Sequence, residues 1–384
     1  MEKLIQVGVD LIPANGGIHK STLQFSEAFG ESPVISFTQR KEIPADATRH
    51  KPIQHFPLSQ NKLLEWYGYA NSKARIEAEK VASEADILCC NIMLRHHACW
   101  LRKFARRNER PYWFVTHGQL DPYVYTTRAI IKKLWLKVFG RKILKDAACV
   151  IFATERERQK AAWFYKGENT RVIHWPVELI DVSKKQTARE HIRSKLGLNP
   201  EDRLLIYLGR LHSMKNPRKT IEALAAGDAP NVHLAMVGPD HDESAESCRE
   251  LARKLGVEDR VHVTGPVYGD DKDAYLLAAD AFISLSQREN FGHTGAEALS
   301  ASTPVILSPG NDLAQDLIPS ACGFFLEDDH MKTAVRAIEA FASTSFDELG
   351  AMGERARKFS EEELSVAKFK ERLQALADET LQKR

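Results

Sequence analysis

The sequence predicts an α/β protein made of two domains, each built around a parallel sheet. The chain has 384 residues, and short apolar runs rich in β-branched and aromatic residues alternate with helical patterns along its whole length. Strands that alternate with helices form βαβ units, in which the strands are parallel. A chain of this length exceeds one ordinary hydrophobic core, which favours two domains of about 150 to 200 residues each.

Candidate strands occur in two series, separated by a stretch without clear periodicity from Pro176 to about Lys185. The first series comprises Leu4–Val9, Val34–Thr38, Asp86–Cys90, Tyr112–Thr116, Cys149–Thr154 and Val172–His174. The second comprises Leu204–Leu208, Val232–Val237, Val261–Thr264, Ala281–Leu285 and Pro304–Leu307. We therefore expect an N-terminal domain over residues 1–177 and a C-terminal domain over residues 178–361.

The last segment, residues 362–384, has the pattern of an amphipathic helix. Ser360 is a candidate N-cap, and apolar residues recur with helical spacing from Leu364 to Leu376. We expect this helix to pack back on the first domain.

Charge is distributed unevenly along the chain. Residues 1–178 carry 28 Lys and Arg against 18 Asp and Glu, a net charge of +10, whereas residues 179–384 carry 26 against 34, a net charge of −8. This asymmetry fits an anionic partner for the first half, either a membrane surface or a phosphorylated acceptor. It fits two differently charged solvated surfaces equally well. We expect no nucleic-acid partner.

Cysteine usage and hydropathy favour a cytoplasmic protein. The six cysteines form no Cys-x-x-Cys pair, and several lie in apolar runs, as expected for buried reduced thiols rather than disulfides or a zinc site. The first residues lack the long apolar region of a signal peptide, and no apolar stretch approaches the ~18 residues that span a bilayer. Peripheral attachment to the inner face of the membrane stays open.

Residues 131–145 interleave basic and apolar side chains. This pattern is typical of a helix that lies on an anionic membrane surface. It is equally typical of a helix that packs on a sheet while its lysines extend their charged ends to solvent. The sequence does not decide between the two interpretations.

The most informative segment runs from Ser286 to Leu299, where a candidate strand is followed by a loop and a helix expected from Gly292 to Ala301. Free amides and the positive end of the helix dipole at such a helix start favour a bound anion. Glu289 precedes the helix and Glu297 lies about two turns into it. Their separation suits hydroxyls at two ends of one ligand. Taken alone, they would be an ordinary loop residue and a solvated helix residue.

A second segment joins a strand end to the expected helix Pro217 to Ala226. It contains a glycine turn at Gly209 and two cations, Arg210 and Lys215. A guanidinium matches the geometry of phosphate oxygens, and a lysine supplies a compact charge. Together these groups suit a diphosphate, although Arg and Lys are common at strand ends.

Four motifs in this order resemble the retaining glycosyltransferases of the GT-B fold, specifically glycosyltransferase family 4, the glycosyl transferases group 1. They are Asn15-Gly16-Gly17-Ile18, Thr116-His117-Gly118-Gln119-Leu120-Asp121-Pro122, Gly209-Arg210 with Lys215, and the segment from Glu289 to Glu297. The resemblance implies two Rossmann-like domains that face each other across a cleft. It also implies that Glu289 contacts the hydroxyls of the donor sugar, Glu297 the ribose, and Arg210 and Lys215 the diphosphate.

The same resemblance implies further site residues. Asn290, Phe291, Gly292 and Thr294 would line the sugar and phosphate site of the second domain. Gly16 and Gly17 would let the first-domain backbone approach the donor phosphates. His117 would face the donor sugar and act with Glu289, Arg210 and Lys215 in catalysis, although a lone histidine after a strand is usually a structural hydrogen-bonding residue.

The sequence departs from the family pattern at two places. Trp175-Pro176-Val177-Glu178 stands where many members have a Pro-Asn-Gly turn, and Asn216 stands where a glycine often follows the lysine. These departures leave the details of the hinge undetermined.

We expect no metal and no bound cofactor. Asp271-Lys272-Asp273 has the spacing of a metal-binding Asp-x-Asp pair, but Asp270 and Asp271 precede a helical stretch from Ala274 to Ala279 and are interpreted as an N-cap and first-turn acids. His96, His97 and Cys99 are likewise expected in a helix rather than at a metal. Cations and a helix N-terminus can stabilise a leaving diphosphate instead.

The expected activity is transfer of a sugar, with retention of configuration, from a UDP- or GDP-linked donor to a hydroxyl of a glycan or lipid-linked acceptor, in polysaccharide or glycolipid assembly. The alternatives are a nucleotide-sugar epimerase of the same fold and a non-catalytic nucleotide-sugar-binding protein. Tyr268 is a candidate to flank the base, but no motif separates uridine from guanosine. The donor sugar, the acceptor and the oligomeric state are not determined by the sequence.

Overall fold

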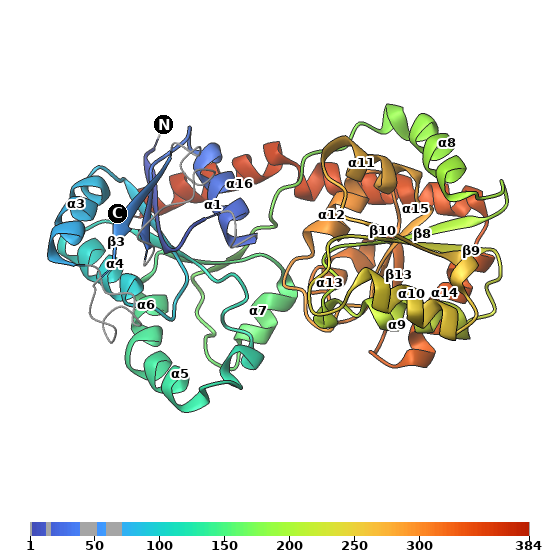
Figure 1. Ribbon diagram of the computed structural model, residues 1–384. Coiled ribbons are helices and arrows are strands. Elements are labelled where there is room, and N and C mark those ends of the chain that lie inside the picture. The colour runs from blue at the N-terminus through green and yellow to red at the C-terminus, as the bar shows by residue number, and fades with distance from the viewer. Residues whose placement is uncertain (1, 13–16, 39–51, 59–70, 384) are drawn as a thin grey trace. The chain divides into compact units, whose positions relative to one another are not determined.

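The computed structural model describes residues 2–12, 17–38, 52–58 and 71–383. The chain forms two compact units (Figure 1): unit 1 comprises Met1–Trp175 with Phe369–Arg384, and unit 2 comprises Pro176–Lys368. The division falls two residues before the boundary expected at 177/178. It interrupts the C-terminal helix α16 (Val366–Gln382), which begins in unit 2 and continues in unit 1.

Unit 1 contains a seven-stranded parallel sheet with the order β3-β2-β1-β4-β5-β6-β7. Its strands are β1 (Leu4–Val9), β2 (Val34–Thr38), β3 (Ile53–Pro57), β4 (Ile87–Asn91), β5 (Tyr112–Val115), β6 (Cys149–Phe152) and β7 (Thr170–Val172). Its helices are α1 (Gly17–Ala28), α3 (Ser72–Ser83), α4 (His96–Arg107), α5 (Ala129–Trp135), α6 (Arg141–Asp146), α7 (Glu155–Ala161) and most of α16, and a π-helical turn, η4 (Leu136–Gly140), joins α5 to α6.

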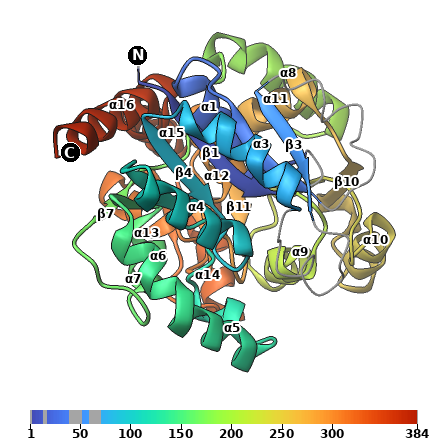
Figure 2. The same ribbon diagram turned by 90° about the vertical axis from the view of Figure 1, so that its left-hand side faces the viewer.

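Helices cover both faces of this sheet, and for this reason its central strands are buried throughout. Figure 2 shows α3 and α4 over one face. Successive residues of β5 point to opposite faces. Tyr112 and Phe114 pack in the core shared with α4 and α6, whereas Trp113 packs on α1 and α16.

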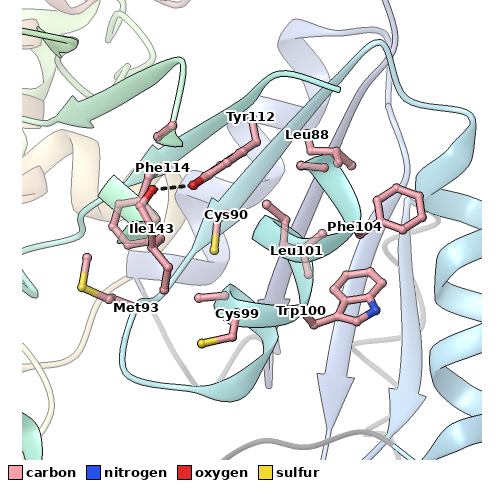
Figure 3. Close-up of a cluster of buried hydrophobic side chains, with 14 of the residues drawn as sticks. Leu88, Cys90, Met93, Cys99, Trp100, Leu101, Phe104, Tyr112, Phe114 and Ile143 are labelled. Atoms are coloured by element: carbon pink, nitrogen blue, oxygen red, sulfur yellow. Dashed lines mark hydrogen bonds between the residues drawn. The ribbon is translucent and has the colours of Figure 1, made fainter. Parts of the chain in front are cut away.

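The core between the sheet, α4 and α6 is rich in aromatic side chains (Figure 3). Trp100 and Phe104 of α4 stack at 5.8 Å between ring centroids. The Tyr112 hydroxyl donates a hydrogen bond to the carbonyl of Ile143, which ties α6 to β5. This core fixes the position of the helical segment that contains the interleaved basic and apolar residues.

The C-terminal helix α16 packs on unit 1. The Phe369 ring meets the Phe25 ring edge-on at 5.3 Å, and the Trp113 indole donates to the Thr380 hydroxyl over 3.0 Å. The helix starts at Val366 rather than at 362, because Ser360–Leu364 forms a separate π-helical turn, η9.

Unit 2 contains a six-stranded parallel sheet with the order β10-β9-β8-β11-β12-β13. Its strands are β8 (Arg203–Leu208), β9 (Val232–Val237), β10 (Val261–Gly265), β11 (Ala281–Ser284), β12 (Val305–Leu307) and β13 (Gly323–Phe325). Its helices are α8 (Lys185–Leu196), α9 (Pro217–Ala226), α10 (Ala245–Lys254), α11 (Gly269–Ala278), α12 (His293–Ser300), α13 (Ala314–Leu317), α14 (Met331–Ser343) and α15 (Phe346–Phe359).

The predicted α/β class with parallel sheets is confirmed, with local corrections. Two edge strands, β3 and β13, were not predicted, and β7 lies two residues earlier than expected. The helix expected from Ala274 begins at Gly269, so Asp270 and Asp271 both lie in its first turn and neither is its N-cap. All six cysteines are buried and free. Within the described ranges, no helix is long and apolar enough to cross a bilayer.

Candidate functional site

In unit 2, the predicted site residues lie at the carboxyl ends of the neighbouring strands β8 and β11. After β8, the chain passes through Gly209 and the exposed Arg210, whose carbonyl accepts a hydrogen bond of 2.8 Å from the Tyr207 hydroxyl. A single 3₁₀ turn, η6 (Ser213–Lys215), then leads to Asn216 and helix α9. Ligands of open α/β sheets bind at this edge, outside the carboxyl ends of the strands.

Lys215 and Glu289 form the central contact of this site. The Lys215 Nζ atom lies 2.6 Å from Glu289 Oε2, and each side chain is 24% exposed. A charge-assisted hydrogen bond at this distance is strong, and partial burial reduces its screening by water. The pair presents one cation and one hydrogen-bond acceptor side by side at the edge of the sheet.

Backbone hydrogen bonds hold Glu289 in place. Its amide donates to the Gly310 carbonyl over 2.7 Å, and its carbonyl accepts from the Asp312 amide over 2.9 Å. Its side chain therefore projects from a segment fixed on both sides, as an orienting group requires.

Asn216 joins the loop after β8 to the loop after β11. Its side chain donates to the Leu285 carbonyl over 2.7 Å, and the Gln287 amide donates to the Met214 carbonyl over 2.8 Å. Asn216 has a left-handed conformation with φ 53°, which asparagine tolerates better than most residues. The departure from the family pattern at this position thus keeps the backbone turn that a glycine would form and adds a link between the loops.

Helix α12 begins without a side-chain cap. Gly292, at φ 78°, is its N-cap, and this conformation strains any residue with a Cβ atom. The buried Phe291 packs edge-on against His293 at 5.1 Å. Asn290 and Thr294 flank this turn and are partly exposed. An uncapped helix start with a close glycine approach offers backbone amides to an anion.

Glu297 lies in α12 and is held by a lysine of α11. Its Oε2 atom is 3.0 Å from Lys272 Nζ, and its side chain is 15% exposed. Burial raises the pKa of the neighbouring Asp273, and the charges of Glu297 and Asp270 act in the same direction while Lys272 opposes them. From the sequence, Lys272 and Asp273 were considered only as part of a metal motif, and the contact of Lys272 with Glu297 was not predicted.

In unit 1, a chain of buried side chains orients His117. The Gln6 amide donates to the Thr22 carbonyl over 2.7 Å, so Gln6 Oε1 accepts from the Asn91 amide at 3.1 Å. Asn91 Oδ1 is then left to accept from His117 Nε2 at 2.7 Å. This network assigns the proton to Nε2 of the imidazole. The ring also stacks on Trp175 at 5.3 Å and 6°.

Glu157 is a buried acid that the sequence analysis missed. It is 2% exposed, and its carboxylate accepts from the Thr116 hydroxyl at 2.6 Å and from the amides of Gly118 at 2.5 Å and Ala153 at 2.7 Å. It thereby fixes the turn that carries His117. The available signal was the Thr-x-x-Glu pattern from Thr154, whose hydroxyl does accept from the Glu157 amide.

Residues of metal-ligand type also gather next to the β8 loop. Potential ligand atoms of His212, His241 and Asp242 all lie within 4.8 Å of one another. The Asp242 carboxylate accepts from the hydroxyl and amide of Ser213, which lowers its pKa to about 2. The sequence did not indicate this grouping, because His212 and His241 lie in loops after different strands.

Two predicted residues fall at the edge of the described chain. Gly16 lies outside it, and Gly17 is the first residue of α1. Gly17 and His117 belong to unit 1, and the other predicted site residues that the structure describes belong to unit 2. The expected cleft between the domains stays a prediction.

Comparisons with known proteins relate this chain to glycosyltransferases. Residues 188–359 match the family described as Glycosyl transferases group 1. The chain is 29% identical over 219 residues to alpha-monoglucosyldiacylglycerol synthase of Streptococcus pneumoniae, with 56% of the chain and 49% of that protein covered. It is 25% identical over 235 residues to GDP-mannose:cellobiosyl-diphosphopolyprenol alpha-mannosyltransferase of Xanthomonas campestris, with 61% and 58% covered. The chain thus spans about half of the length of the curated relatives it matches.

The similarity to solved structures extends over more of the chain than the sequence matches do. Anabaena Alr3699/HepE, solved in complex with UDP-glucose, superposes with a TM-score of 0.75 over 100% of both chains at 18% identity. The two parallel-sheet units are those of the GT-B fold, to which the solved glycosyltransferases similar to this chain belong. The protein therefore has the GT-B fold, and its residues 188–359 match the glycosyl transferases group 1 family.

Proposed function

We propose that the protein transfers a hexosyl group from a nucleoside-diphosphate sugar to a hydroxyl of a glycan or lipid-linked acceptor, with retention of configuration and without a metal. The observation that carries this proposal is the Lys215–Glu289 pair, formed by the loop that also contains Arg210, at the edge of the sheet that also holds the uncapped start of α12. Glu289 and Glu297 offer acceptors for hydroxyls, and Arg210 and Lys215 offer cations for a diphosphate.

In the proposed reaction, the bond between the sugar C1 atom and the β-phosphate oxygen breaks, and its electron pair stays on the diphosphate. Arg210, Lys215 and the amides at the start of α12 stabilise this charge. The acceptor hydroxyl attacks C1 from the leaving-group face and passes its proton to a diphosphate oxygen. Glu289 orients the sugar through its hydroxyls, and the imidazole of His117 interacts with it from unit 1.

The donor is proposed to be UDP- or GDP-linked. Similar proteins include one solved in complex with UDP-glucose and a GDP-mannose-dependent mannosyltransferase. The mannosyltransferase is named for a diphosphopolyprenol-linked acceptor, and the synthase similar to this chain is named for a lipid product, a glucosyldiacylglycerol. They support a lipid-linked acceptor, and with it a role in glycolipid or polysaccharide assembly.

The test is calorimetric titration in the presence of EDTA with UDP, GDP and ADP and their common sugar conjugates. Wild type is compared with Arg210→Ala and Glu297→Ala, and with Lys254→Ala as a control on the exposed end of α10. We expect one nucleotide to bind tightly and both site variants, but not the control, to weaken binding at least tenfold. Absence of binding, or binding that ignores both residues, would overturn the assignment. Isomerised sugar nucleotide formed without acceptor would favour an epimerase.

We also propose that unit 1 docks on an anionic membrane surface. Residues 122–145 contain seven Lys and Arg and no Asp or Glu. Helices α5 and α6, joined by η4, form the segment Ala129–Asp146, and both figures place α5 at the lower edge of unit 1. Ile130 is 84% exposed and Leu134 is 59% exposed, so the start of this segment, residues 129–134, does not pack these apolar side chains on the sheet.

The reason for this exposure is that the segment touches the core only from Trp135 onwards. A Cβ atom on Gly140 would lie 2.8 Å from a Leu136 methyl group and 3.3 Å from the Phe164 ring, so the glycine permits a close approach there. Leu136, Ile143 and Leu144 are buried on this side. Packing on the core therefore accounts for the segment from Trp135 onwards, and it leaves the exposed residues of α5 to another partner.

Exposed apolar and basic side chains alternate along this segment in a way that suits a bilayer interface. Lys133, Lys137 and Arg141 recur every four residues and so lie along one side of the helix. Each cation near an anionic surface contributes about 1 kcal/mol to the free energy of binding. At physiological salt this attraction is screened beyond roughly 8 to 10 Å. We expect binding to phosphatidylglycerol vesicles at low salt and release at high salt. A lack of vesicle binding at low salt would overturn the docking proposal and leave the sugar-transfer proposal intact.

A further inference from the structure

A hollow of about 610 Å³ lies in unit 1 beside the segment Ala129–Asp146. One wall is α4, which contributes Cys99, Arg102 and Lys103, and the other is the segment from Trp135 onwards, which contributes Trp135, Phe139 and Lys142. Ligand sites of small molecules typically have volumes of about 300 to 1,000 Å³. Neither the nucleotide-sugar site in unit 2 nor the turn at His117 includes these residues.

The charge of this hollow is positive and uncompensated. Its lining residues, all within the described chain, include no Asp or Glu. Arg102 is paired with Asp146 at 2.5 Å, so its charge is balanced. Lys103 and Lys142 are exposed and form no ion pair with an acid of the described residues, and they stand on opposite walls.

The neighbouring His96 responds to this positive field. Burial lowers the pKa of its imidazole to about 4, and the charges of Lys103 and Arg75 act in the same direction. The ring is therefore neutral at pH 7, and the two lysines supply the cations. An anion in the hollow would therefore meet a lysine on each wall.

The remaining lining is apolar and aromatic. The rings of Trp135 and Phe139 lie 5.6 Å apart, and Phe139 is 43% exposed. Cys99 and Ile143, both labelled in Figure 3, line the hollow and also belong to the packed core. The hollow thus combines a cationic rim with an apolar wall that continues into the exposed residues of α5.

We propose that this hollow binds the headgroup of an anionic phospholipid, with Lys103 and Lys142 on the phosphate and Trp135 and Phe139 along the first part of the acyl chains. The inference deepens the membrane docking proposed above by assigning a headgroup site to it. It does not depend on sugar transfer. A phosphate between two lysines and chains along aromatic rings match the distribution of charge and apolar surface in the hollow.

The test separates the hollow from the exposed face of the helix. Dihexanoylphosphatidylglycerol, a soluble short-chain lipid used below its micellar concentration, is titrated calorimetrically into the full-length protein. Dihexanoylphosphatidylcholine, inorganic phosphate and farnesyl diphosphate are titrated in parallel. The hollow variants are Lys142→Glu and Phe139→Ser, and the matched controls are Lys137→Glu and Ile130→Ser, on the same helical segment but outside the hollow.

We expect the anionic lipid to bind at least tenfold more tightly than the other three ligands. Lys142→Glu and Phe139→Ser should weaken this binding at least tenfold, and both controls should leave it within twofold. The controls should instead reduce binding to intact phosphatidylglycerol vesicles. Unchanged circular dichroism and thermal unfolding would show that each variant is folded.

The proposal is overturned if the choline lipid binds equally well, or if Lys142→Glu has no larger effect than Lys137→Glu. Tighter binding of farnesyl diphosphate would mean that the ligand is a polyprenyl diphosphate and not a phospholipid. Equal binding of inorganic phosphate would mean that the aromatic wall does not contribute to binding. Because the short-chain lipid is monomeric, failure of vesicle docking with retained lipid binding would contradict the docking proposal alone.

Discussion

The Lys215 ammonium lies 2.6 Å from the Glu289 carboxylate and thereby joins the loops that follow two neighbouring strands of unit 2. The two residues are 74 positions apart in the sequence. In the proposed site this contact has two roles. It neutralises the carboxylate when no ligand is bound, and it holds the lysine where a diphosphate would lie.

Lys215→Ala is expected to lower kcat/KM by about 10- to 100-fold, because a hydrogen bond to a charged group contributes about 1.5 to 3 kcal/mol. The measurement is steady-state kinetics with the donor identified by titration. Lys219→Ala, in the first turn of α9, is the control, since Lys219 is partly exposed and its side chain donates to the carbonyl of Asp329. Full activity of Lys215→Ala would contradict the role of the pair.

Glu297→Gln is expected to weaken nucleotide binding, whereas Lys272→Ala is expected to leave it unchanged or strengthen it. The Lys272 contact at 3.0 Å competes with a ligand hydroxyl for the same carboxylate. Calorimetry with the nucleotide alone distinguishes the two variants. An equal loss in both would mean that the pair serves only to join α11 to α12.

Asn91→Ala is expected to lower kcat as much as His117→Ala does, and the double variant no further. The reason is that Asn91 Oδ1 holds the imidazole at 2.7 Å, so both substitutions remove the same oriented ring. Asn91 is 1% exposed, and thermal unfolding of each variant is the control for lost packing. Additive losses in kcat would show that Asn91 does not act through His117.

The stability of the protein is expected to fall as pH decreases from about 6.5 to about 4, in part because of His97. Burial lowers the pKa of this imidazole to about 4 from an ordinary value of 6.5. As pH falls, the unfolded state therefore binds the proton at a higher pH than the folded state does. The contribution of His97 to the free energy of unfolding is complete above pH 6.5 and is lost towards pH 4.

Urea unfolding at several pH values measures this effect. His97→Gln, which keeps a donor for the Asn91 carbonyl, should show a shallower loss of unfolding free energy over this range, and the exposed His191→Gln should match wild type. A slope unchanged by His97→Gln would contradict the assignment.

Sugar transfer is expected to continue in EDTA and to be unaffected by His241→Ala. The proposed site stabilises the leaving diphosphate with Arg210, Lys215 and helix amides. If a metal is needed instead, the group formed by His212, His241 and Asp242 is the candidate to hold it. Activity lost in EDTA, restored by a divalent cation and absent in His241→Ala would place a functional metal beside the β8 loop.

Much of the fold could be predicted from the sequence because its signals are local. The apolar runs that became β1, β2 and β9 have the predicted bounds, and Pro217 marks the start of α9. The edge strand β3 was missed because Ile53–Pro57 is only partly buried and ends in proline, so it lacks a continuous apolar pattern. The three-residue strand β13 is too short to show a repeating pattern of apolar residues.

The sequence by itself determined the α/β class, the chemical identity of the candidate groups and their order along the chain, since composition and local periodicity specify these. It left open where residues 131–145 lie, and the tertiary structure decided that Ile130 and Leu134 are exposed, because the core reaches this segment only near Gly140. It also did not reveal that Glu157 supports the His117 turn or that Lys272 meets Glu297. Such contacts join residues distant in sequence, and they exist only once parallel strands bring their carboxyl ends to one edge of a sheet.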